Sequence, residues 1–310
     1  MRAPPFSSSV HFATRCCPST RSKMRPVSVL KEVDVVRVRG RARRSDTDRA
    51  AAEEPLEVRL HGRPFAVVMR TPGADRELAA GFLLAERVIR CADDLGTIEH
   101  CRDHVRLPPS REASADRQPD VADNIVNVTL AGCSRVDLDR ILAERRETVA
   151  NASCGLCGRL TIESLRSDTA PLAPGGCVTA AAVSTLPARL RVAQAVFEAT
   201  GGLHAAGLFT EDGALVTMAE DVGRHNAVDK VIGRMLMRDA LPLSGHALFV
   251  SGRTSFEIVQ KALIAGIPVV ASVSAPSSLA IDLAREAGVT LVGFVRGDSF
   301  NIYAHPERIV

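Results

Sequence analysis

The sequence contains no tryptophan and only one tyrosine among its 310 residues. A platform of aromatic side chains that stacks nucleobases is therefore not expected. No apolar run reaches the roughly 18 residues that a membrane span requires. The segment Val10–Thr14 is too short and too polar for the core of a secretory signal. We therefore expect a cytoplasmic protein that binds neither nucleic acid nor a membrane.

Basic charge is concentrated at the start of the chain. Residues 1–50 carry 12 Lys+Arg and 4 Asp+Glu, a net charge of +8; subtraction from the totals of 39 and 36 leaves 27 basic and 32 acidic residues, or −5, for residues 51–310. We interpret residues 1–50 as a basic, disordered leader. Residues 1–23 precede Met24 and are interpreted as an extension upstream of the true start.

The rest of the chain is predicted to divide near residue 150. In residues 51–150, two strands are expected within 57–69, a helix over 76–90, a flexible polar insert at 107–123 and a strand over 125–130. In residues 151–310, a helix over 187–200 and a hairpin over 203–218 come first. Strands at 247–250, 268–273 and 290–294 then alternate with helices at 256–265 and 279–287. This alternation is typical of a parallel sheet covered on both faces, so we expect an α/β domain preceded by a smaller, mostly β subdomain.

Eight cysteines are present, and the only C-x-x-C spacing joins Cys154 to Cys157. Such a pair can bind zinc, act as a redox dithiol or carry a persulfide. A structural zinc site needs four ligands, and no second C-x-x-C or H-x-x-x-H pair exists, although Cys177 with a distant histidine could complete one. Two ordinary loop cysteines remain the alternative to all three chemistries.

A second polar motif runs from Glu220 to Lys230 at a loop-to-helix junction. It is either a solvated helix start or a ligand or proton-transfer site, in which Asp221 or Asp229 tunes His225. His204 stands at the head of an apolar strand, where it is either a core histidine or a functional one. Asp221 is also a plausible N-cap of the following helix.

Two strand–loop–helix units present Ser251-Gly252-Arg253 and a loop beginning at Ser274. Ligands of open α/β sheets bind at the carboxyl ends of parallel strands. Helix N-termini attract phosphate there, and Arg253 adds a bidentate phosphate donor. The P-loop pattern is absent. The two loops together therefore suggest a nucleotide or another phosphorylated ligand.

In these motifs the sequence resembles the FdhD family of sulfurtransferases, which formate dehydrogenase activity requires. The resemblance covers residues 55–304 and rests on Met69–Gly73, Glu77–Leu83, Ser153–Gly158, Gly201–Ala206, Glu220–Lys230, Ser251–Arg253, Ser274–Pro276 and Gly293–Gly297. It implies that the C-terminal domain has the three-layer, cytidine deaminase-like fold without the deaminase zinc site. The H-x-E…P-C-x-x-C zinc pattern is indeed absent, because no proline precedes Cys154.

The resemblance also implies a mechanism. Cys154 would accept sulfur as a persulfide from a cysteine desulfurase of the IscS type, with Cys157 as the assisting thiol. The sulfur would pass to the molybdenum, or tungsten, of a bis-molybdopterin guanine dinucleotide cofactor destined for formate dehydrogenase. The family's cofactor segment matches Phe294, Val295, Arg296, Gly297, Asp298 and Ser299, although Asp298 is an acid near the expected phosphates. We expect further cofactor contacts at Ser251, Gly252, Arg253, Ser274, His204, Arg224 and His225, no structural metal, and a homodimer.

Two alternatives stay open at this point. A nucleotide-binding enzyme with structural cysteines would turn over a free nucleotide and tolerate the loss of Cys154. A zinc-binding adaptor would hold about one zinc ion per chain through its cysteines.

Overall fold

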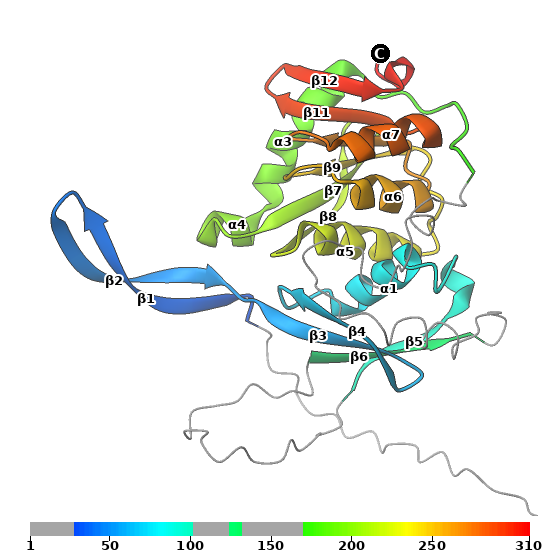
Figure 1. Cartoon of the computed structure of the whole chain (residues 1–310). Helices are drawn as coiled ribbons and strands as arrows, with labels where there is room; N and C mark the ends of the chain where they lie inside the picture. The colour runs from blue at the N-terminus through cyan, green and yellow to red at the C-terminus, as the bar shows by residue number, and fades with distance from the viewer. Residues whose placement is uncertain (1–27, 102–123, 132–169) are drawn as a thin grey trace, which may run out of the picture.

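Three β-sheets organise the chain in the computed structural model, which describes residues 28–101, 124–131 and 170–310 (Figure 1). They are a two-stranded arm, a four-stranded sheet and a six-stranded sheet. The α/β fold class is confirmed, with a mostly β N-terminal part and an α/β C-terminal part. The predicted boundary near residue 150 and the insert at 107–123 lie outside the described residues.

The six-stranded sheet forms the centre of the C-terminal part. Its strands are β7 (His204–Thr210), β8 (Leu215–Asp221), β9 (His246–Val250), β10 (Val269–Ser272), β11 (Thr290–Arg296) and β12 (Ser299–Ala304), in the order β12-β11-β10-β9-β7-β8. Strands β9, β10 and β11 are parallel, whereas β7 runs antiparallel to both β8 and β9. The predicted parallel sheet is thus confirmed for three strands. The carboxyl ends of β9, β10 and β11 share one edge with the amino end of β7.

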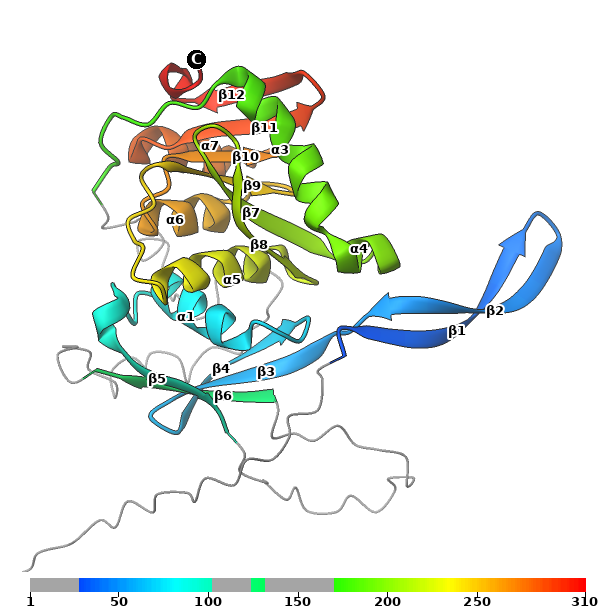
Figure 2. The same ribbon diagram turned by 180° about the vertical axis from the view of Figure 1, so that it is seen from behind.

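Helices cover both faces of this sheet (Figures 1 and 2). One face is covered by α5 (Arg224–Leu236), α6 (Phe256–Ile264) and α7 (Ser278–Ala287). The other face is covered by α3 (Ala180–Ala193) and α4 (Ala195–Thr200). A short 3-10 turn (Pro306–Arg308) follows β12. One apolar cluster fills the space beneath α5, α6 and α7, and a second fills the space beneath α3. Three layers result, as expected. The narrower likeness to cytidine deaminases stays a prediction.

The four-stranded sheet belongs to the N-terminal part. It consists of β3 (Glu54–Leu60), β4 (Arg63–Arg70), β5 (Leu95–His100) and β6 (Ile125–Leu130), in the order β4-β3-β6-β5. Helix α1 (Asp75–Ala85) and a 3-10 turn (Ala92–Asp94) connect β4 to β5. Helix α1 packs on α5 through two glycines. A Cβ atom on Gly233 would lie 1.9 Å from the carbonyl oxygen of Glu77, and one on Gly81 would lie 2.0 Å from that of Asp229. The two parts of the chain therefore share one continuous core.

The arm corrects a prediction. Strands β1 (Leu30–Arg39) and β2 (Ala42–Ala51) pair over their whole length and project away from both larger sheets (Figures 1 and 2). Residues 30–50 are therefore a β-hairpin and not a disordered leader, while residues 1–27 lie outside the described residues. Four valines are interspersed with charged residues along β1, and β-branched residues favour a strand. Gly40 supplies the positive φ of 60° that a tight turn requires.

The helix expected over 187–200 is also different. It begins at Ala180, because the Thr179 hydroxyl accepts a hydrogen bond from the Ala182 N–H at 3.1 Å and caps it. Pro187 lies inside α3 and not at its start. A new helix, α4, begins after Gln194 and ends at Gly201 in a left-handed conformation. Strands β5 and β12 were not predicted.

Candidate functional site

The predicted ligand loops meet at one edge of the six-stranded sheet. Ser251, Gly252 and Arg253 follow β9, and Ser274 follows β10. The Phe294 N–H donates to the Ser274 carbonyl oxygen at 3.2 Å, which holds β11 at the same edge. The structure thus brings together loops that lie more than 20 residues apart in the sequence.

Ser251 has a structural role at this edge. Its hydroxyl oxygen accepts a hydrogen bond from the Ala205 N–H at 2.8 Å, and its own N–H donates to the Ala205 carbonyl at 2.9 Å. The Ser274 carbonyl accepts from the Ser272 hydroxyl at 2.8 Å. Both serines therefore shape the loops, while Arg253 is exposed beside them. Ser277 caps α7.

His204 stands at the amino end of β7, next to Gly252. A Cβ atom on Gly252 would lie 3.3 Å from Nδ1 of His204, so the imidazole occupies the space that a side chain would need. Burial, and then the Arg224 guanidinium, lower the pKa of His204, and the Asp221 carboxylate opposes them. His204 is therefore neutral near pH 7, which leaves one ring nitrogen as an acceptor.

Arg224 and His225 begin α5 beside His204. Nε2 of His225 lies 3.0 Å from the Ser255 hydroxyl and 3.7 Å from Oε2 of Glu257. Burial lowers the pKa of His225 to about 3, helped by the charges of Arg224 and Lys261. Nε of Arg224 is buried and has no hydrogen-bond partner in the part of the chain that the structure describes. Two neutral imidazoles and a buried guanidinium N–H thus lie together at the edge.

The prediction that Asp221 or Asp229 tunes His225 is wrong. Asp221 is fully buried, and its carboxylate accepts hydrogen bonds from Gly223 N–H and the Asn226 amide, both at 2.8 Å. Its other oxygen lies 2.7 Å from Nζ of Lys230. Gly223, and not Asp221, is the N-cap of α5. Asp229 accepts a hydrogen bond from Nζ of Lys261 at 2.6 Å. Both carboxylates are therefore occupied by partners in the core other than His225.

This buried network joins the two parts of the protein. The Thr71 N–H donates to Oδ2 of Asp221 at 3.2 Å, and Lys230 donates to the Thr71 carbonyl at 2.8 Å. Asn226 donates to the Met69 carbonyl at 2.8 Å. Much of the Glu220–Lys230 motif therefore holds the turn after β4 against α5. Its functional candidates reduce to Arg224 and His225.

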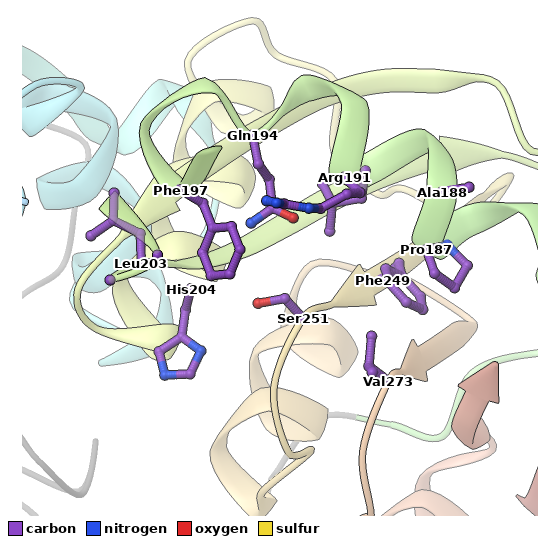
Figure 3. A pocket seen from close by; sticks show the side chains of 13 residues that line it. Pro187, Ala188, Arg191, Gln194, Phe197, Leu203, His204, Phe249, Ser251 and Val273 are labelled. Carbon is purple, nitrogen blue, oxygen red and sulfur yellow. The ribbon is translucent and has the colours of Figure 1, made fainter. Parts of the chain in front are cut away.

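A cavity of about 690 Å³ opens between this edge and helices α3 and α4 (Figure 3). Its lining comprises Pro187, Ala188, Leu190, Arg191, Gln194, Phe197, Gly201, Gly202, Leu203, His204, Phe249, Ser251 and Val273. Phe197, His204 and Ser251 surround one end, and Phe249, Pro187 and Val273 surround the other (Figure 3). Ligand pockets of this size with apolar walls and few polar groups accept small molecules.

The segment Phe294–Ser299 divides into a buried and an exposed part. Phe294 has a φ of 54° at a break in the β11–β12 register, a backbone strain that is common at functional sites. The Arg296 guanidinium lies 5.7 Å from the Phe294 ring. Val295 is buried in the core beneath α3, so the prediction of a cofactor contact there is wrong for its side chain. Arg296, Gly297, Asp298 and Ser299 are exposed at the β11–β12 turn.

Comparison with known proteins identifies the family of the chain. The model of the FdhD/NarQ family matches residues 51–310. The chain belongs to the FdhD/NarQ family. It is 49% identical over 278 residues to the sulfur carrier protein FdhD of Streptomyces coelicolor, covering 89% of this chain and 94% of that protein. It is 48% identical over 263 residues to the protein of the same name from Mycobacterium tuberculosis, covering 84% and 91%.

A solved structure of a family relative agrees. A crystal structure of a candidate formate dehydrogenase accessory protein from Desulfotalea psychrophila superposes with a TM-score of 0.69 at 26% identity, covering 91% of this chain and all of that one. The resemblance to the FdhD family is therefore confirmed.

Several site residues of this FdhD/NarQ member were not predicted from its sequence. Arg191, Gln194 and Phe197 line the cavity from α3, α4 and the junction between them. The Arg191 guanidinium lies 4.3 Å from the Phe197 ring and is ion-paired with Glu198 at 2.7 Å. The predicted helix over 187–200 contained these three residues, but a helical pattern alone does not show that they line a cavity at the sheet edge.

Cys154 and Cys157 lie outside the described residues. Cys177 is an exposed free thiol. Within the described ranges, no group of three or more histidine, cysteine or acidic side chains could hold a metal ion. None of the helices in those ranges combines the length and apolar character needed to span a bilayer.

Proposed function

We propose that this chain is a sulfur carrier that supports the maturation of formate dehydrogenase. The observation that carries the proposal is the 48% to 50% identity, over 84% to 89% of the chain, to relatives named sulfur carrier protein FdhD. The sequence supplies the chemistry such a role needs, since Cys154 and Cys157 form its only C-x-x-C pair.

Cys154 accepts the sulfur in this proposal. Its thiolate attacks the persulfide of a cysteine desulfurase and takes over the sulfane sulfur, while the donor cysteine leaves as a thiolate. Cys157 then attacks the inner sulfur of the Cys154 persulfide. The outer sulfur departs as sulfide, two thiols are oxidised to a disulfide, and a thiol reductant reopens that disulfide for the next cycle. This chemistry is best placed in the cytoplasm, where thiols are kept reduced.

The acceptor is the molybdenum of a bis-molybdopterin guanine dinucleotide, bound as a substrate. Its flat guanine ring suits the cavity, where Phe197, Phe249 and His204 offer ring-shaped walls. Its phosphates suit the exposed Arg253 and Arg296 along the same sheet edge. The sulfurated cofactor is delivered to formate dehydrogenase, and the carrier acts as a homodimer.

Buried charge limits where the phosphates lie. Glu257 stands in the first turn of α6 beside His225, so an anion at that N-terminus would meet a carboxylate. The Nε–H of Arg224 is a buried donor beside His225 that has no hydrogen-bond partner among the described residues. The phosphates therefore lie toward Arg224 and Arg253 and not at the α6 N-terminus.

Radiolabelled cysteine tests the carrier role. After incubation with a cysteine desulfurase and ³⁵S-cysteine, we expect reductant-sensitive label on the peptide that contains Cys154. The label should disappear in Cys154→Ala and persist in Cys177→Ala, the matched control that removes an exposed thiol elsewhere. Absence of label on the wild-type peptide would exclude sulfur carriage.

Cys157 and the two alternative functions are tested separately. A Cys154–Cys157 disulfide should accumulate after a single turnover without reductant, and full transfer by Cys157→Ala would refute its role. About one zinc ion per purified chain would favour the adaptor, and turnover of a free nucleotide by Cys154→Ala would favour the nucleotide enzyme.

A further inference from the structure

Charge is segregated along the arm formed by β1 and β2. The outer part, residues 36–45, contains five arginines and no acidic residue. The inner part carries Glu32 and Asp34 on β1 and Asp46 and Asp48 on β2, against Lys31 and Arg49. The tip is therefore positive and the base negative.

The two faces of the arm differ. Residues directly opposite in an antiparallel pair share a face, and successive residues alternate between faces. On one face Arg37 and Arg44 form ion pairs with Asp46 at 2.9 and 2.8 Å, and Arg37 reaches Asp48 at 3.4 Å. This face pairs all of its charged side chains except Arg39 within the described residues, and its valines, Val33 at 38% exposed and Val35 half-buried, are better covered than those of the other face.

The other face is here called the valine face. It consists of Glu32, Asp34, Val36 and Val38 from β1 and of Arg43, Ser45, Thr47 and Arg49 from β2. Val36 is 61% exposed and Val38 57% exposed. Asp34 and Arg43 are exposed, and within the described residues neither forms an ion pair. A two-stranded ribbon of this kind is marginally stable in water unless something packs on it.

We propose that the valine face packs on the valine face of a second copy of this chain, with the two arms antiparallel across a two-fold axis. The valines of the two copies then cover one another. Arg43 of each arm, on β2, lies diagonally across from the partner's Asp34, on β1, within reach of its long side chain, so the ion pair occurs twice. This contact locates the homodimer proposed above and rests on it.

The charge pattern favours a second copy over other occupants. An antiparallel pair of identical arms places the positive tip of each against the negative base of the other, so the surface is complementary to itself. Nucleic acid would instead bring phosphates against Glu32 and Asp34 on the same face. It would also leave Val36 and Val38 without an apolar partner.

The size of the contact sets the conditions of the test. Ten residues per strand make a ribbon about 34 Å long and about 10 Å wide, or about 300 Å² per copy. A standard stable interface buries about 800 Å² per partner. The association is therefore weak unless other surfaces add to it, and it should be followed from about 1 to about 100 μM at low and high salt.

Sedimentation equilibrium on charge-swap variants tests the proposal. Asp34→Arg and Arg43→Asp each convert two attractions into two repulsions, so each should raise the dimer Kd about tenfold or more. The double variant Asp34→Arg/Arg43→Asp restores opposite charges and should return the Kd to within about threefold of wild type. Arg39→Asp, on the opposite face, is the matched control and should leave the Kd close to wild type.

Several outcomes would overturn the proposal. A wild type that stays monomeric over this range refutes it, as does a double variant no better than the singles. If every variant dimerises like wild type, the homodimer stands and only the arm contact is refuted. If the wild type is monomeric and the Arg43→Asp variant loses binding to a cysteine desulfurase, the arm is assigned to that partner instead. Far-UV circular dichroism checks that each variant is folded.

Discussion

Replacing Gly233 with alanine tests the contact that joins the two parts of the protein. A Cβ atom there would lie 1.9 Å from the Glu77 carbonyl oxygen and 2.6 Å from the Gly81 nitrogen. Both atoms belong to the backbone of α1, so no side-chain rotation relieves the overlap. The helices must separate by about 1 Å or more, which opens the apolar core between them.

Two effects of this substitution oppose each other. Alanine in a helix interior gains about 1 kcal/mol over glycine. Overpacking a close contact costs about 1–3 kcal/mol, and more when backbone must move. Because the overlap with Glu77 is severe, we expect the steric cost to prevail by about 2 kcal/mol or more. That corresponds to a fall in Tm of about 4–8 °C.

Thermal unfolding followed by far-UV circular dichroism measures the change, since the chain has no tryptophan to report by fluorescence. Gly245→Ala is the matched control, because a Cβ atom at Gly245 meets nothing within 4 Å. Its Tm should stay within about 1 °C of wild type, because surface changes away from special features shift stability little. A Gly233→Ala variant with an unchanged or raised Tm would refute the close packing of α1 on α5.

Three further predictions concern the site. Gly252→Ala places a Cβ atom 3.3 Å from Nδ1 of His204 and should turn that imidazole. Binding of GDP, a probe for the guanine nucleotide of the proposed cofactor, should therefore weaken about tenfold in calorimetry while the Tm changes little. Unchanged binding would show that His204 does not contact the nucleotide. Burial lowers the pKa of His225 to about 3, whereas its pKa in the unfolded chain is near 6.5. Between these two values only the unfolded state binds a proton at His225. The free energy of unfolding therefore falls as the pH drops from about 6.5 towards 3. His225→Gln should lose less stability over that interval in urea titrations, and an equal loss in both proteins would contradict the burial of this imidazole. Val295→Ala should lower the free energy of unfolding by about 1–2 kcal/mol without weakening GDP binding, because this side chain is in the core. Arg296→Glu should weaken GDP binding and leave the stability unchanged, because this side chain is exposed. The same effect from both substitutions would contradict the assignment of Val295 to the core and of Arg296 to the site.

Local sequence patterns predicted most elements of the C-terminal part. The strands at β9, β10 and β11 and the helices α6 and α7 were placed within a few residues, because each apolar run or helical period is complete within the element itself. The arm was missed because five arginines in its outer half outweigh its valines in composition. The pairing that stabilises it depends on the cross-strand register, which composition does not contain.

The sequence by itself determined the α/β class and the family, since hydrophobic periodicity and motif order are properties of the chain, and it predicts thiol chemistry at Cys154. It could not assign roles within the Glu220–Lys230 motif. Asp221 and Lys230 are structural because both meet Thr71, about 150 residues away, in a site buried from solvent. His204 is a site residue because β7 and β9 pair antiparallel and bring it beside Gly252. Burial and partner identity arise from such long-range contacts, so only the tertiary structure decided which polar residues hold the fold and which face the cavity.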